Sequence, residues 1–129
     1  MMKKFNMEIQ DIYISIGNYG CLILAYLNEA NIKVDITSYF NNLVELGIIN
    51  EDCFILDANR LLKYFGSELR VKRGFNPNGN TIVKFRTAAS NEGHFVVINK
   101  NREIVFNSLE NSNCVKNGFI DETSARYLA

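Results

Sequence analysis

The sequence predicts a single α+β domain, with helices in its first half and an antiparallel sheet in its second half. This prediction rests on a change of hydrophobic period. Up to Gly66 the apolar residues recur at helical spacing, whereas beyond it they alternate with polar residues as in strands. A chain with its helices before its strands belongs to the α+β class. With 129 residues, 47% of them hydrophobic, the chain can form one domain, 1–129, with its own core.

Three helices are predicted in the first half, at residues 21–27, 36–46 and 58–65. The second helix is capped by Asp35 or Thr37 and is ended by Gly47, because a glycine readily takes the left-handed conformation after a helix. The third is capped by Asp57 and is ended by Gly66.

Two segments precede these helices. Residues 17–20, Gly-Asn-Tyr-Gly, are predicted to form a loop because of their glycine content. Residues 8–15 fit either a helix or a strand, and the pattern leaves this choice open.

Strands are predicted at residues 69–72, 81–86, 94–98 and 103–106, with a short final strand at 118–120. Turns rich in asparagine separate them at residues 76–80 and 99–102. If the strand 94–98 pairs with 103–107 across its hairpin, His94 lies opposite Asn107 and Ile98 opposite Glu103. The expected register therefore brings a histidine and an asparagine together.

Cys21 is the candidate nucleophile of the chain. It follows Gly20 at a helix start, where unpaired N–H groups and the helix dipole favour a thiolate. Cys53, in an apolar connector, and Cys114, in a polar loop, lack this setting. The simpler interpretation of Cys21 is a small apolar residue in a buried helix.

His94, the only histidine, is the candidate proton carrier for a cysteine nucleophile. Such a base needs a partner on its second ring nitrogen, and Asn107 is the best placed. Glu110 and Asp121 are weaker candidates for this orienting role. The simpler interpretation of His94 is a histidine that faces solvent or is hydrogen-bonded in the core.

Three segments resemble the papain-like superfamily of cysteine peptidases: Gly20-Cys21-Leu22, Gly93-His94-Phe95-Val96-Val97-Ile98 and Val105-Phe106-Asn107-Ser108-Leu109. They are most similar to the bacteriocin-processing C39-type peptidases, and the resemblance covers roughly residues 10–120. It implies a papain-like fold with N-terminal helices packed on a C-terminal antiparallel sheet. It also implies roles as nucleophile, general acid/base and orienting residue for Cys21, His94 and Asn107. The whole chain is also similar to an uncharacterised family carried on spirochaete plasmids and prophages.

The chain departs from the papain-like pattern at one position. Papain-like enzymes place a glutamine a few residues before the cysteine to donate a hydrogen bond to the oxyanion, and that place lies near Ser15 here. Loss of one such donor typically lowers the rate about a hundred- to a thousandfold. Asn18 and Gln10 are the candidate side-chain donors, with the backbone N–H of Cys21 as the second donor.

The resemblance implies a cysteine hydrolase that cleaves a peptide or amide bond, such as a peptidoglycan cross-link, through a Cys-His-Asn triad. The alternative is a catalytically inactive papain-like binding module of mobile-element origin, for example an inhibitor of a host defence complex. The small size of the chain and the missing glutamine favour this alternative. The expected partner is accordingly a peptide-like substrate or another protein.

A basic patch is a further candidate binding site. Arg70 and Lys72 share one face of a predicted strand, Lys84 and Arg86 share one face of another, and Arg73 lies nearby. If the two strands pair, these side chains form a surface that could contact phosphates. Solvated charges on the open face of an antiparallel sheet are the simpler interpretation.

The composition argues against several other functions. The 14 basic and 14 acidic residues cancel, which does not favour nucleic acid or an anionic membrane as a partner. We expect no metal or cofactor, because one histidine cannot form a histidine-rich zinc site and no glycine-rich phosphate loop is present. No apolar stretch approaches the roughly 20 residues of a membrane span, and nothing resembles a signal peptide. The three cysteines lack a pairing motif and predict a reducing compartment, the cytoplasm.

Overall fold

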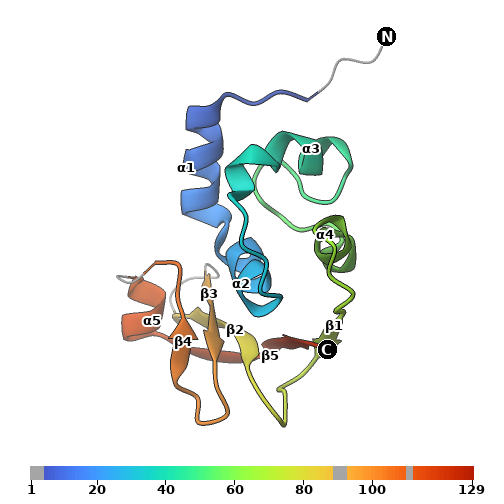
Figure 1. The fold of residues 1–129 in the computed structure, drawn as a ribbon. Coiled ribbons are helices and arrows are strands. Elements are labelled where there is room, and N and C mark those ends of the chain that lie inside the picture. The colour runs from blue at the N-terminus through green and yellow to red at the C-terminus, as the bar shows by residue number, and fades with distance from the viewer. Residues whose placement is uncertain (1–4, 89–92, 110–111) are drawn as a thin grey trace.

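The computed structural model describes residues 5–88, 93–109 and 112–129, which form helices packed on a five-stranded antiparallel sheet (Figure 1). The helical elements are α1 (Ile9–Tyr19), α2 (Cys21–Glu29), a 3-10 turn η1 (Ile36–Ser38), α3 (Phe40–Glu45), α4 (Ala58–Tyr64) and α5 (Asn113–Asn117). The strands are β1 (Val71–Arg73), β2 (Thr81–Arg86), β3 (Gly93–Ile98), β4 (Ile104–Phe106) and β5 (Phe119–Leu128). The predicted α+β class is confirmed.

Helix α1 resolves the open choice at residues 8–15 in favour of a helix and corrects the predicted loop at 17–20. The helix continues through Tyr19, because a single glycine such as Gly17 costs a helix only about 1 kcal/mol. Gly20 alone separates α1 from α2. A Cβ atom at Gly20 would lie 2.6 Å from the carbonyl oxygen of Ile16, so this junction requires glycine. The junction places Cys21 at the start of α2.

The predicted helix at 36–46 is interrupted at Tyr39, which divides it into η1 and α3. Asp35 is the cap, since its carboxylate accepts a hydrogen bond from the backbone N–H of Thr37 at 3.1 Å. Gly47 follows α3 with a φ of 72°, as expected for a glycine that ends a helix. The predicted cap of α4 is also confirmed, because Asp57 accepts a hydrogen bond from the backbone N–H of Arg60 at 3.1 Å.

Replacing Asp57 by alanine is expected to lower the free energy of unfolding by about 1 kcal/mol, because the first turn of α4 loses its cap. Urea denaturation followed by circular dichroism measures this change. Glu68→Ala removes an exposed carboxylate outside the helices and serves as the control. An equal loss in both variants would show that the effect is one of net charge and not of capping.

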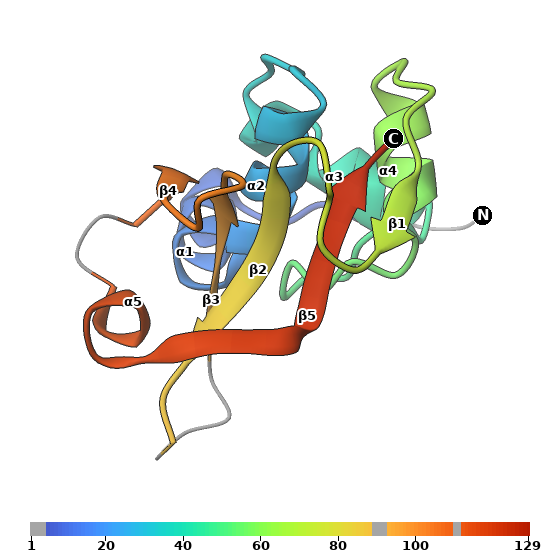
Figure 2. The same ribbon diagram turned by 90° about the horizontal axis from the view of Figure 1, so that it is seen from below.

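The strand order is β1-β5-β2-β3-β4, so the last strand lies inside the sheet between β1 and β2 (Figure 2). β5 is ten residues long and corrects the predicted short strand at 118–120. Its polar run Asp121-Glu122-Thr123-Ser124 interrupts the alternating pattern by which a strand is recognised. β1 begins at Val71, two residues later than predicted, although the backbone of Arg70 also pairs with Ala129, the residue after β5.

The hairpin of β3 and β4 is confirmed, but its predicted register is wrong. Ile98 lies opposite Ile104, one residue beyond the predicted Glu103, and Val97 lies opposite Phe106. The register shifts between these two pairs, because β4 contains an extra residue there. Such a bulge does not change the alternation of apolar and polar residues, so the sequence does not predict it.

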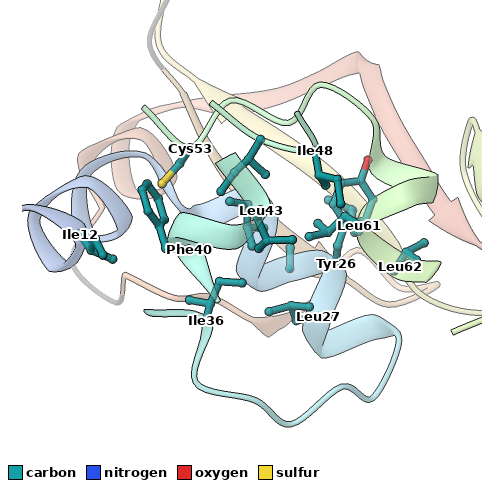
Figure 3. Packing of buried hydrophobic residues seen from close by; sticks show 14 of the residues in the cluster. Ile12, Tyr26, Leu27, Ile36, Phe40, Leu43, Ile48, Cys53, Leu61 and Leu62 are labelled. Atoms are coloured by element: carbon teal, nitrogen blue, oxygen red, sulfur yellow. The ribbon is translucent and has the colours of Figure 1, made fainter. Parts of the chain in front are cut away.

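The main hydrophobic core lies between the helices and one face of the sheet (Figure 3). Phe40, Leu61 and Ile82 are completely buried in it and connect α3, α4 and β2. Val83, the next residue of β2, belongs to a second and smaller core on the opposite face, which includes Val115 of α5. The sheet is therefore covered by α1 to α4 on one face and in part by α5 on the other.

Candidate active site

The fold brings Cys21 to the start of β3. Helix α2 packs on β3, and the sulfur of Cys21 accepts a hydrogen bond from the backbone N–H of Phe95 at 3.5 Å. The residue before Phe95 is His94, whose side chain is hydrogen-bonded to the thiol of Cys21. The two catalytic candidates therefore meet, although 73 positions separate them in the chain.

Asn107 holds the other side of the histidine ring. The distance from its Oδ1 to Nε2 of His94 is 2.6 Å. The same Oδ1 accepts a hydrogen bond from the backbone N–H of Leu109 at 3.0 Å, which fixes the orientation of the amide. Because this oxygen can only accept, Nε2 carries a hydrogen and Nδ1 is the nitrogen left for the thiol. The contact predicted between His94 and Asn107 is present although the strand register differs.

These contacts shift the pKa values of both groups in the direction of an ion pair. Burial opposes ionisation of Cys21, but the hydrogen bond from His94, its charge and the N–H groups of Phe95 and Leu22 hold the pKa of the thiol below its ordinary value. The hydrogen bond with Cys21 raises the pKa of His94 against the effect of burial, and Asn107 adds to this rise. The arrangement favours a thiolate beside an imidazolium.

Cys21 lines an open cleft with a volume of about 1100 Å³. Its lining comes from the end of α1, from α2, from the loop 50–55, from the start of α4 and from the strands. Gly93 and Phe95, the neighbours of His94, line the cleft, whereas His94 does not line it and is only 6% exposed. A bound molecule therefore meets the sulfur first and the histidine behind it.

The loop 50–55 has a defined conformation. The hydroxyl group of Ser15 donates a hydrogen bond to the carbonyl oxygen of Glu51 at 2.8 Å and lies 3.4 Å from the sulfur of Cys53. The side-chain oxygen of Asn50 accepts hydrogen bonds from the backbone N–H groups of Asp52 and Phe54 at 2.9 and 3.0 Å. Cys53 lines the cleft too, but burial raises the pKa of its thiol. Cys21 is the activated thiol of the pair.

Of the two candidate oxyanion donors, only Asn18 lies at the cleft. It is exposed in the last turn of α1 and lines the cleft together with Cys21. Gln10 lies two turns earlier on the same helix, about 12 Å away along the axis at 1.5 Å per residue. Gln10 is exposed and does not line the cleft. The structure therefore brings Asn18, and not Gln10, to the candidate nucleophile.

The weaker orienting candidates do not take the place of Asn107. Asp121 accepts hydrogen bonds from the backbone and side chain of Thr123 and pairs with Arg86, with 3.3 Å between Oδ2 and Nε. Glu110 lies outside the described residues. Asn107 is thus the orienting residue that the described structure brings to His94.

The two strands that carry the predicted basic patch do not pair, because β5 lies between β1 and β2. Arg70 is exposed, and its backbone pairs with Ala129. Arg86 is engaged by Asp121 and by the ring of Phe119, 5.0 Å from the guanidinium carbon. Lys84 lines the cleft with two other basic residues, Arg73 and Arg126, whereas Arg70, Lys72 and Arg86 do not.

Sequence reasoning did not identify Arg126 or the loop 50–55 as parts of the site. Both enter it through long-range pairing, Arg126 through the position of β5 between β1 and β2, and the loop through Ser15. Neither feature has a local sequence signal. Within residues 5–88, 93–109 and 112–129, no three histidine, cysteine or acidic side chains are grouped to hold a metal ion.

In the same ranges no helix has the length and apolar character that crossing a membrane requires. No curated protein and no solved structure matches the chain. A family model described as "Protein of unknown function, DUF261" matches residues 2–127. The match spans almost the whole chain, including all the residues of the cleft and of the Cys21 contact network. The chain therefore belongs to the DUF261 family.

Proposed function

We propose that this protein is a papain-like cysteine hydrolase that cleaves a peptide or amide bond, such as a peptidoglycan cross-link. The observation that carries the proposal is the contact of three side chains. Asn107 lies 2.6 Å from His94, His94 is hydrogen-bonded to Cys21, and Cys21 lines an open cleft. An activated thiol, a base and a group that orients the base are the parts which nucleophilic catalysis by cysteine requires.

In the proposed reaction, the thiolate of Cys21 attacks the carbonyl carbon and forms a carbon–sulfur bond. The imidazolium of His94 then gives a proton to the leaving nitrogen as the carbon–nitrogen bond breaks, which leaves a thioester. A water molecule loses a proton to His94 and attacks the thioester carbonyl, so that the acid departs and the thiolate is restored. Asn107 keeps the ring in the tautomer that this sequence needs.

The negative oxygen that forms in each step needs hydrogen-bond donors. Cys21 is the first residue of α2, and its backbone N–H is one of those that a helix start leaves without an intrahelical acceptor. The side-chain amide of Asn18 supplies the second donor, since it lines the cleft beside Cys21. Asn18 thus replaces the glutamine of the papain-like pattern.

Replacing Cys21 by serine is expected to reduce hydrolysis more than about a thousandfold, because the hydroxyl group is a far weaker nucleophile at neutral pH. A pool of peptide amides that release a fluorescent amine on cleavage measures the rate. Cys114→Ser is the matched control and keeps the wild-type rate. Equal cleavage by wild type and the Cys21→Ser variant would contradict the proposal and favour the non-catalytic binding module.

A further inference from the structure

Two arginines face each other inside the cleft that holds Cys21. Arg73 of β1 and Arg126 of β5 are direct cross-strand partners, and both line the cleft. Like charges in directly opposite positions of an antiparallel pair destabilise a sheet. A pair of this kind in a cleft indicates a place where a bound anion offsets the repulsion.

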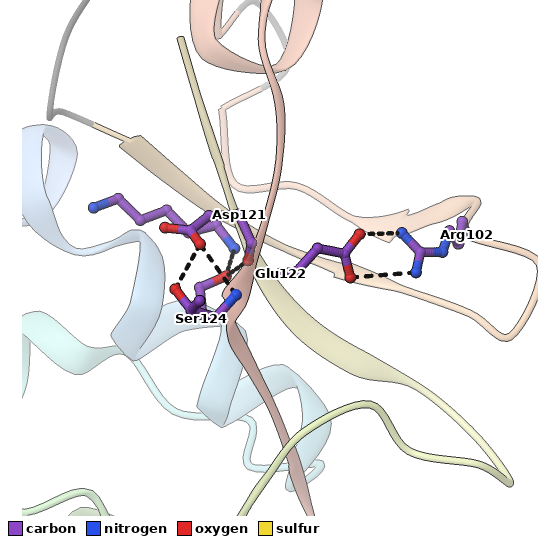
Figure 4. Close-up of polar contacts among 6 residues, drawn as sticks. Arg102, Asp121, Glu122 and Ser124 are labelled. Atoms are coloured by element: carbon purple, nitrogen blue, oxygen red, sulfur yellow. Dashed lines mark hydrogen bonds and ion pairs between the residues drawn. The ribbon is translucent and has the colours of Figure 1, made fainter. Parts of the chain in front are cut away.

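The acidic residues of β5 do not neutralise this pair. Asp121 pairs with Arg86. Glu122 pairs with Arg102 at 2.9 Å, as Figure 4 shows. Among the described residues that line the cleft, Asp52 is the one acidic residue, against three basic residues. The described part of the lining therefore carries more positive than negative charge, although the whole chain carries no net charge.

The side chain of Arg126 is held in place by neutral groups. Its Nε donates a hydrogen bond to the carbonyl oxygen of Ser124 at 2.9 Å, and one terminal nitrogen lies 3.4 Å from the hydroxyl group of Tyr26. Its guanidinium carbon also lies 5.1 Å from the ring centre of Phe95. None of these contacts removes the charge, so the guanidinium is oriented and remains able to bind an anion.

Arg73 is exposed, and no described residue forms an ion pair or side-chain hydrogen bond with it. Lys84 extends the basic surface toward the thiol. Its aliphatic chain crosses Gly93, where a Cβ atom would lie 2.2 Å from Cε of Lys84. Gly93 directly precedes His94, so the basic residues extend from the strand pair to the candidate catalytic histidine.

We propose that Arg73 and Arg126 bind a carboxylate of the substrate, so that this protein acts on acidic peptides. The inference rests on the proposed function and names the substrate class of the same site. Two guanidinium groups suit a carboxylate, because each presents parallel N–H donors that match its two oxygens. The carboxylate comes either from an acidic side chain or from the C-terminus of the peptide, and the test distinguishes the two.

The test uses three N-iodoacetyl dipeptides that alkylate Cys21. The Gly-Gln amide is neutral, the Gly-Glu amide carries a side-chain carboxylate, and Gly-Gln with a free C-terminus carries a terminal one. Mass spectrometry of peptide fragments gives the rate at Cys21 for each reagent. We expect at least one acidic reagent to react about tenfold faster than the neutral one. The reason is that charge-assisted hydrogen bonds between its carboxylate and the two arginines strengthen binding by about this factor.

The ratio of acidic to neutral rates is expected to fall about fivefold to tenfold in Arg73→Gln and below one in Arg73→Glu. Arg70→Gln is the matched control, since it removes an exposed arginine outside the cleft, and it keeps the wild-type ratio. Arg126→Gln is expected to lower the ratio as Arg73→Gln does. The Arg73 variants are the decisive test of the carboxylate site, because Arg73 is exposed and its replacement removes no described packing contact.

Two outcomes would overturn the inference, and they differ in what they say of the proposed function. Fast alkylation by the neutral reagent with a ratio near one, or a ratio unchanged in Arg73→Gln, would refute the carboxylate site alone. Neutral alkylation of Cys21 no faster than that of Cys114 would refute the activated thiol and with it both proposals.

Discussion

Replacing His94 by glutamine is expected to lower hydrolysis about a hundred- to ten-thousandfold, the usual contribution of a general acid–base group. It is also expected to lower the alkylation rate of Cys21 by neutral iodoacetamide at pH 6 more than about tenfold. The reason is that burial, which raises the pKa of the thiol, is then opposed only by the N–H groups of Phe95 and Leu22. At a pH below the pKa, each unit by which the pKa rises lowers the fraction of thiolate tenfold.

The direction of the pKa shifts also sets the pH dependence. The pKa of Cys21 is lowered, so the thiolate persists as pH falls below the ordinary thiol value near 8.5 and is lost only through the lowered pKa. The pKa of His94 is raised, so its proton is retained as pH rises past about 6.5. Hydrolysis is therefore expected to be bell-shaped in pH, with Cys21 on the acid limb and His94 on the alkaline limb.

The thiol of Cys114 provides an internal reference, because the same sample reports both alkylation rates. In the His94→Gln variant the midpoint of Cys21 alkylation is expected to move to higher pH, while the rate of Cys114 alkylation at each pH is expected to match that of the wild type. An unmoved midpoint at Cys21 would show that His94 does not ionise the thiol and would contradict its role as the base.

Local chemistry explains which parts of the fold could be predicted. Asp35 and Asp57 cap helices through contacts with residues two or three positions away, so their sequence signals are sufficient. The junction at Gly20 could not be predicted from glycine content, since Gly17 and Gly20 look alike in sequence and only Gly20 separates two helices. Steric contact with Ile16, and not glycine content, decides between them.

The place of β5 inside the sheet could not be predicted, because β5 pairs with strands far from it in the chain: β2, the nearer of the two in sequence, ends at Arg86, and β5 begins at Phe119. Its position separates β1 from β2, the two strands whose pairing the predicted basic patch assumed. The same position creates the pair of Arg73 and Arg126. One unpredicted strand therefore both separates the residues of the predicted patch and brings together the two arginines of the proposed carboxylate site.

The candidate site was more accessible to sequence reasoning than the sheet. Cys21 carries the local signal of a glycine-led helix start, and His94 is the only histidine of the chain. Asn107 was identified through a hairpin whose register is wrong, yet the contact forms, because its amide reaches back toward the start of β3 and is fixed by Leu109. Two residues near the open end of a hairpin therefore meet even when the predicted register is wrong by one position. The same error in a buried strand would turn its side chains to the opposite face.

Replacing Phe40 by alanine is expected to lower the free energy of unfolding by about 3–5 kcal/mol, a large part of the 5–15 kcal/mol typical of a domain. Phe40 is completely buried and lies between Ile12 of α1 and Cys53 of the cleft loop (Figure 3). Its removal leaves a cavity beneath that loop, because the packed neighbours relax only in part. Urea denaturation measures the loss.

Phe54→Ala is the matched control, since it deletes the same atoms from a side chain that is 66% exposed and lines the cleft. It is expected to change the free energy of unfolding by less than about 0.5 kcal/mol, as exposed substitutions usually do. A loss of unfolding free energy as large for Phe54→Ala as that expected for Phe40→Ala would mean that the side chain of Phe54 is packed in solution and that the cleft is closed. A large loss for Phe40→Ala alone would show that Phe40 supports the loop, whereas Phe54 is a residue that the loop presents to a bound molecule.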